Sequence, residues 1–285
     1  MMKQTYFQIL KSLIQIPSPS GHEKELVDFI IENYLIEGWV VERDVFHNIL
    51  FRPVGDDKTE KLPLLYAHLN THPNGKPDMA NLTQGDIIWL DESGEVNKKH
   101  DIQMGFDDKA GVAAILYLMK HTNLKFRALL VVQEEESDLR KKHNRIGGGG
   151  IEYAINHNLR WVFEKSAYVL SLDRRFDKDA EAEGENGNQI ITTYGNDIRR
   201  PFIHLCSPKF AKWVVDCSDQ ANHPMVISES KNVADVYNIR SDFPNLDCVN
   251  LSIGYYCEHN YCEHLNINET LGVIRVVQEC LTSRE

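Results

Sequence analysis

The chain carries histidine and carboxylate side chains at several separate places where they could bind metal ions. These residues are His68, Asp107, Glu134, Glu135, Asp173 and His259. Imidazole and carboxylate groups in this mixture suit borderline divalent cations, zinc first, with cobalt or manganese as alternatives. Two such ions that share a bridging carboxylate can polarise a carbonyl group and activate a water molecule. The residue types therefore indicate hydrolysis assisted by a pair of metal ions.

The glutamate run 134–136 can supply both a metal ligand and a base. Neighbouring side chains on an extended segment point in different directions, so one carboxylate can face a metal while the next faces the water. In isolation, such a run is more often a group of solvated charges. Its position directly after the apolar segment ALLVVQ argues against that interpretation.

The order of the segments predicts an α/β protein. Short, continuously apolar stretches alternate with stretches that have apolar residues at helical spacing, which indicates a mostly parallel, mixed sheet covered by helices on both faces. We expect strands at 39–45, 48–53, 62–69, 126–133, 167–172 and 248–256, and a hairpin at 85–96. We expect helices at 4–16, 22–38, 108–121, 151–158, 208–220 and 269–281.

These elements would bring the candidate ligands to one edge of the sheet. In such sheets, ligands bind beyond the carboxyl ends of the strands. Four candidates lie at or shortly after strand ends: His68, Glu134, Asp173 and His259. Asp107 stands where a loop enters a helix. We therefore expect the candidates to meet at this edge, although Asp107 alone could equally be a helix N-cap.

The segment CEHNYCEH at 257–264 raises the alternative of a local zinc site. Cys257, Cys262 and His264 could contribute to one, but structural zinc usually uses two well-spaced ligand pairs. We assign His259 to the sheet-edge site and the residues around it to supporting positions. His72 is expected in a loop or at the substrate rim.

Six motifs in a fixed order resemble the co-catalytic zinc exopeptidase superfamily, which includes aminopeptidases, peptidase T, and carboxypeptidase and deacylase relatives. The motifs are IPSPSGHE (16–23), YAHLNTHP (66–73), GFDDKAG (105–111), VVQEEES (131–137), LSLDRR (170–175) and LSIGYYCEH (251–259). The resemblance implies a phosphorylase/hydrolase-like zinc exopeptidase fold. Only residues 174–258 separate the last two candidate ligands, so we expect no inserted lid or dimerisation domain and one catalytic domain over 1–285.

The resemblance also implies a role for each candidate residue. His68 and Asp173 would bind one zinc ion, and Glu135 and His259 the second. Asp107 would bridge both ions, often with a cis peptide bond to Asp108. Glu134 would be the general base.

Asn70 is the main departure from the family pattern, because the first motif of the family is His-x-Asp. The aspartate normally accepts a hydrogen bond from the ligand imidazole; Asn70 can accept through its amide oxygen but carries no charge. Loss of such a partner typically costs about 10–100-fold in affinity or activity. We count Asn70 with Glu134 among the catalytic residues, and the substitution leaves a catalytically degenerate protein as one alternative.

Composition and charge narrow the class of partner. The 285 residues have a net charge of −11 and no basic patch, which argues against nucleic acid. We read no signal peptide and no membrane span, and the six cysteines show no paired framework, so we expect a cytoplasmic protein with free thiols.

The function we expect is a two-zinc aminopeptidase that acts on peptides. The alternatives are an N-acyl amino acid deacylase or carboxypeptidase-like amidohydrolase, with an acylated amino acid as substrate, and the degenerate metal-binding protein.

Overall fold

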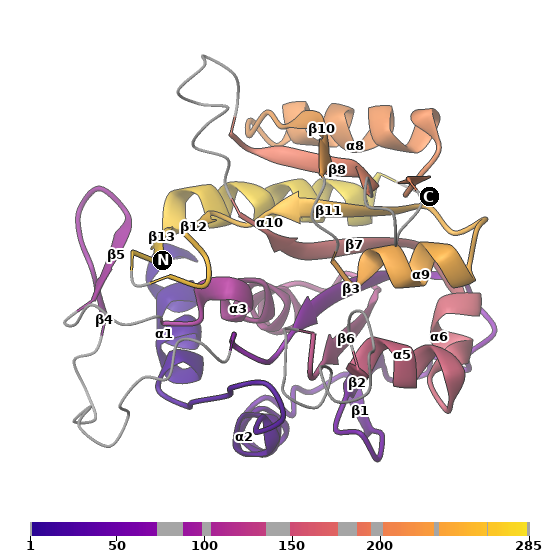
Figure 1. Ribbon diagram of the computed structural model, residues 1–285, viewed down its shortest axis with the longest axis horizontal. Helices are drawn as coiled ribbons and strands as arrows, with labels where there is room; N and C mark the ends of the chain where they lie inside the picture. Colours follow the sequence, from indigo (N-terminus) through magenta and orange to yellow (C-terminus); the bar gives the residue numbers. More distant parts are fainter. Residues whose placement is uncertain are drawn as a thin grey trace.

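A mixed, nine-stranded sheet forms the centre of the computed structural model (Figure 1). The structure describes residues 2–72, 88–98, 104–134, 149–175, 187–194, 202–230, 234–260 and 262–283. The strands follow the order β1-β2-β6-β3-β7-β11-β8-β10, with β9 paired to β8. Their bounds are β1 Trp39–Arg43, β2 Ile49–Pro53, β3 Leu62–His68, β6 Arg127–Val131, β7 Ser166–Arg174, β8 Gln189–Tyr194, β9 Ile203–His204, β10 Val226–Ser230 and β11 Cys248–Ser252.

The middle of the sheet is parallel, as the apolar runs predicted. Strands β6, β3, β7 and β11 lie side by side in the same direction, so their carboxyl ends share one edge. Antiparallel pairs flank this centre, between β2 and β6 on one side and between β11 and β8 on the other.

Helices cover both faces of the sheet because the buried strands are apolar on both sides. On β3, Leu64 and Tyr66 pack into one hydrophobic cluster, whereas Leu65 and Ala67 pack into the other. The first of these clusters includes residues of α5 (Gly149–Asn156), α6 (Arg160–Glu164) and α9 (Val236–Asp242). The second includes residues of α1 (Met2–Ile14), α2 (Lys24–Asn33), α3 (Phe106–His121), α8 (Pro208–Gln220) and α10 (Ile267–Thr282).

A four-stranded sheet in the order β12-β13-β5-β4 lies beside the main one. It contains the predicted hairpin as β4 (Ile88–Leu90) and β5 (Glu95–Lys98), with β12 (Tyr255–Tyr256) and β13 (His264–Asn266). The strand expected at 248–256 is divided into β11 and β12. Gly254 has a φ of +90°, and a Cβ there would lie 2.9 Å from the carbonyl oxygen of Asn266, so this glycine permits a bend that another residue would strain.

Several shorter elements were not expected, among them β8, β10, α6 and α9. Helix α2 ends at Asn33 rather than at residue 38, and residues 34–38 turn into β1. No lid domain is evident in the described part of the chain, and no helix there is long and apolar enough to cross a membrane.

Candidate metal centre

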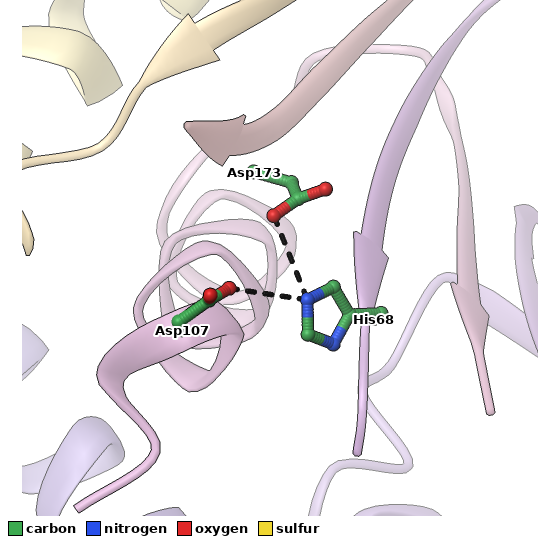
Figure 2. A group of neighbouring side chains, drawn as sticks. All are labelled: His68, Asp107 and Asp173. Atoms are coloured by element: carbon green, nitrogen blue, oxygen red, sulfur yellow. Dashed lines mark hydrogen bonds and ion pairs between the residues drawn. The ribbon is translucent and has the colours of Figure 1, made fainter. Parts of the chain in front are cut away.

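His68 and Asp173 meet because they end two neighbouring parallel strands, β3 and β7 (Figure 2). His68 Nε2 lies 3.5 Å from Asp173 Oδ1, and both side chains are buried. His68 Nδ1 donates a hydrogen bond to the backbone carbonyl oxygen of Asn70 at 2.9 Å. Since a carbonyl oxygen only accepts, this bond places the hydrogen on Nδ1 and turns Nε2 toward the carboxylates.

Asp107 connects His68 to His259. Its Oδ1 atom lies 3.1 Å from His68 Nε2, and its Oδ2 atom lies 3.0 Å from His259 Nε2. Asp107 stands in the first turn of α3, where its backbone is not helical and the peptide bond to Asp108 is cis, as the resemblance implied. The two oxygens of one carboxylate thus face two separate imidazoles, which is the arrangement a bridging ligand requires.

The charges at this site fit a cation. Burial alone lowers the pKa of the His68 imidazole, but the Asp173 and Asp107 carboxylates outweigh it and raise this pKa well above its ordinary value. Burial and the negative charges of Asp173 and Asp107 raise the pKa of Asp108. The carboxylates therefore create a negative field in which a divalent ion can replace the proton on His68.

The spacing of the ligand atoms also fits zinc. One donor atom each from His68, Asp107 and Asp173 lie within 4.8 Å of one another. Ligands at usual zinc distances, arranged tetrahedrally, lie about 3.4 Å apart. His68 Nε2 lies 3.1 Å from Asp107 Oδ1 and 3.5 Å from Asp173 Oδ1, and these two distances bracket this value. The donor set and its spacing thus fit a metal ion.

Glu263 holds the loop that carries Asp107, a role the sequence analysis did not assign. Its fully buried carboxylate accepts hydrogen bonds from the backbone N–H groups of Met104 at 2.8 Å, Gly105 at 2.8 Å and Asp107 at 3.1 Å. Burial raises the pKa of Glu263 to about 7. No local pattern in CEHNYCEH distinguishes this glutamate from Glu258, because its partners lie far away in the sequence.

Asn70 differs in detail from the expectation. Its backbone oxygen, not its amide oxygen, accepts the bond from the His68 imidazole. The amide Oδ1 atom instead accepts a hydrogen bond from the backbone N–H of Glu134 at 2.8 Å. The side chain of Asn70 is thus linked to the expected base rather than to the expected metal ligand.

The IPSPSGHE motif contributes a support for the same edge of the sheet. The carboxylate of Glu23 accepts from the backbone N–H groups of Gly21 at 3.0 Å and Gln133 at 2.9 Å. Ser18 Oγ donates to the carbonyl oxygen of Leu69 at 2.8 Å. These bonds join the N-terminal loop to the segments that follow β3 and β6.

A pocket opens over the site. Its walls include Asp107, Glu134, Asp173 and His259, together with Arg174, Arg175, Tyr194, Ala234, Tyr255 and Glu258. The His72 ring stacks on the His259 ring with centroids 4.5 Å apart, consistent with its expected place at the rim. Glu135, the remaining expected ligand, lies outside the described residues.

The local zinc site considered for 257–264 has no support among the described residues. Among the described residues, the side chains close enough to share a metal ion are those of His68, Asp107 and Asp173, and no cysteine belongs to this group. His264 instead stacks on Tyr256 and bonds to the carbonyl oxygen of Cys262.

Comparisons with known proteins agree with this fold. The aminopeptidase PepT of Bacillus cereus superposes with a TM-score of 0.71 at 12% identity, over 98% of both chains. A tripeptidase of Staphylococcus aureus superposes with a TM-score of 0.69 at 14% identity, over 99% of this chain and 98% of that one. An aminopeptidase of the archaeon Desulfurococcus kamchatkensis superposes with a TM-score of 0.70 at 14% identity, over 99% of this chain and 96% of that one. The chain therefore has the fold of these peptidases.

In sequence, the chain is 28% identical over 187 residues to the cytosol non-specific dipeptidase of Escherichia coli, which is 64% of this chain and 34% of that protein. The chain thus spans about a third of that relative's length. No family model matches. The resemblance to the co-catalytic metallopeptidases, which the motifs first indicated, is confirmed by these relatives.

Proposed function

We propose that the protein is a metal-dependent hydrolase that removes N-terminal residues from peptides. The observation that carries this proposal is the position of Asp107, whose two carboxylate oxygens each face one imidazole. A single-ion site or a structural ion pair has no need of a second histidine on the far oxygen. The dipeptidase, aminopeptidase and tripeptidase named among the similar proteins support peptides as the substrate class.

The ligands divide into two sets around Asp107. His68 and Asp173 would hold one zinc ion, His259 and Glu135 the other, and Asp107 both. When bound, the two ions polarise the scissile carbonyl group and lower the pKa of the attacking water. Cobalt or manganese would suit the same donors.

The residues of the chain supply the proton transfer. Glu134 lines the pocket beside Asp107 and Asp173, so its carboxylate can take a proton from water and deliver it to the leaving amine nitrogen. Asn70 fixes the backbone at Glu134, and Glu263 fixes the backbone at Asp107. The base and the shared ligand are thus positioned by buried side chains that need not contact the substrate.

We also propose that residues 1–285 form one catalytic domain that acts in the cytoplasm. The six cysteines form no disulfide bond in the described structure, which suits a reducing compartment, and the similar dipeptidase is described as cytosolic.

The test is hydrolysis by zinc-loaded protein of a panel of dipeptides, tripeptides and N-acetyl amino acids. We expect peptide hydrolysis that Glu134→Gln abolishes while zinc stays bound. Glu164→Gln changes a glutamate that is 52% exposed, and this control should keep full activity. Turnover of N-acetyl amino acids alone would indicate the deacylase instead, and an inactive zinc-loaded protein would indicate the degenerate one.

A further inference from the structure

Arg174 is a partly buried cation at the end of β7, directly after Asp173. Its Nε atom is buried without a hydrogen-bond partner, and its side chain makes no ion pair with any described residue. An unpaired, partly desolvated charge is costly unless an anion arrives to pair with it.

Two other arginines show how this chain usually satisfies such groups. Arg127, which is fully buried, donates to both carboxylate oxygens of Asp56, at 2.7 and 2.8 Å. Arg175 pairs with Glu258 at 2.9 Å. Arg174 differs from both arginines because it has no ion-pair partner among the described residues, although it lies between the candidate ligand Asp173 and the paired Arg175.

Arg174 lines the same pocket as the candidate ligands and the candidate base. Burial raises the pKa of the Tyr194 phenol on the pocket wall, and the positive charge of Arg174 opposes this rise. The guanidinium group therefore acts electrostatically on a side chain of the pocket wall that it helps to line.

Three carboxylates of the pocket, those of Asp107, Asp173 and Glu258, have partners other than Arg174. Asp107 faces two imidazoles, and Asp173 Oδ1 lies near His68 and accepts a bond from the Tyr255 hydroxyl at 3.4 Å. Glu258 is paired with Arg175. Among the described residues, no carboxylate pairs with Arg174, so its guanidinium is open to an anionic group of a ligand.

We propose that Arg174 binds a carboxylate group of the substrate, which makes short or acidic peptides the preferred substrates. This inference rests on the proposed peptidase function. The planar guanidinium can grip a carboxylate through two parallel hydrogen bonds, and a lysine cannot reproduce this geometry.

Two substrate groups offer this chemistry close to the scissile bond. One is the C-terminal carboxylate of a dipeptide, which lies within one residue, about 3.8 Å of chain, of the bond that is cut. The other is the side chain of an N-terminal aspartate or glutamate. Peptides that carry only one of these groups separate the two sources.

The experiment measures binding by calorimetry to the zinc-loaded Glu134→Gln variant, which should not turn over its ligand. The probes are Ala-Ala, with a C-terminal carboxylate; Asp-Ala-amide, with a side-chain carboxylate; and Ala-Ala-amide, with neither. We expect at least one of the two carboxylate probes to bind about 30-fold more tightly than Ala-Ala-amide, as judged by the dissociation constants. Adding Arg174→Gln should remove that preference, and Arg174→Lys should restore part of it.

Lys212→Gln is the charge-matched control. It removes one positive charge from a side chain on α8 that is 74% exposed, and it should leave the preference intact. A structural role for Arg174 predicts that Arg174→Gln weakens all three probes equally. That result, or equal or undetectable binding of all three probes to the parent, overturns the proposal.

The two proposals fail separately. If the wild type hydrolyses Ala-Ala, Asp-Ala-amide and Ala-Ala-amide with equal kcat/KM, the peptidase stands and the role of Arg174 is refuted. If binding depends on the carboxylate and on Arg174 but no peptide is hydrolysed, the role of Arg174 stands and the peptidase is refuted.

Discussion

The change of Asn70 to alanine separates two roles that this residue could have at the site. The side chain is fully buried, and its Oδ1 atom accepts the backbone N–H of Glu134 at 2.8 Å. The His68 imidazole donates its hydrogen bond to the backbone carbonyl oxygen of residue 70, which alanine also has. Asn70→Ala should therefore loosen Glu134 and leave the orientation of His68 unchanged.

The expected size of each effect follows from these bonds. A partly buried N–H left without an acceptor costs about 1–3 kcal/mol. Misplacement of a catalytic group by about 1 Å can cost 10²-fold in rate, so we expect kcat/KM to fall about 10–100-fold. Zinc affinity should change by less than about threefold, because the partner of the imidazole is retained.

The assay pairs peptide turnover with zinc affinity, measured by competition with a chromogenic chelator. Asn156→Ala is the control, because Asn156 is exposed on α5 and bonds only within its own helix in the described structure. Asn70→Asp keeps an acceptor for the Glu134 N–H and removes the buried Nδ2 group, which has no partner among the described residues. It should retain more activity than Asn70→Ala. A 10–100-fold loss of zinc affinity in Asn70→Ala would refute this reasoning, since it would mean that the side chain acts on His68.

Three further predictions concern the supports of the site and of the fold. Gly111→Ala would place a Cβ 2.3 Å from the carbonyl oxygen of Leu172, where α3 meets β7; we expect urea denaturation to show a loss of about 1–3 kcal/mol, with weaker zinc binding. Glu263→Gln leaves at least one of three backbone N–H groups without an acceptor, and zinc affinity in the chelator assay should fall about 10–100-fold. Asp56→Asn leaves the buried Arg127 without its counter-charge and should cost about 3–5 kcal/mol in urea denaturation at neutral pH. The hydrogen bond from Arg127 lowers the pKa of Asp56 in the folded protein. The ion pair therefore stabilises the fold fully above the unfolded-state pKa of aspartate, about 3.9, and this stabilisation is lost as the pH falls through the lower folded-state pKa. The difference in unfolding free energy between the wild type and Asp56→Asn should therefore shrink in acid.

The candidate ligands could be located from the sequence because they follow long apolar runs. The run before His68 and the run before Asp173 are buried on both faces and become neighbouring parallel strands, β3 and β7. Parallel strands bring their carboxyl ends to one edge, so strand prediction alone places the two side chains together. The division of 248–256 at Gly254 was missed, because a single glycine within an apolar run does not reveal its φ angle.

The supports of the site could not be predicted, because they depend on contacts between distant segments. Glu263 bonds to backbone groups more than 150 residues earlier in the chain. Backbone N–H groups leave no trace in the amino-acid pattern, so nothing marked this glutamate as the one that holds the loop at Asp107. The same holds for the bond from the Glu134 N–H to Asn70, which only the fold brings together.

The most direct test of the central claim is the number of zinc ions per chain, measured by elemental analysis after equilibration with zinc. We expect about two ions in the wild type and a loss of both on Asp107→Ala, because this carboxylate contacts both imidazoles. The control Asp216→Ala changes a carboxylate that is 47% exposed on α8 and should keep both ions. A wild type that binds one ion or none, or an Asp107→Ala protein that keeps two, would contradict the shared site.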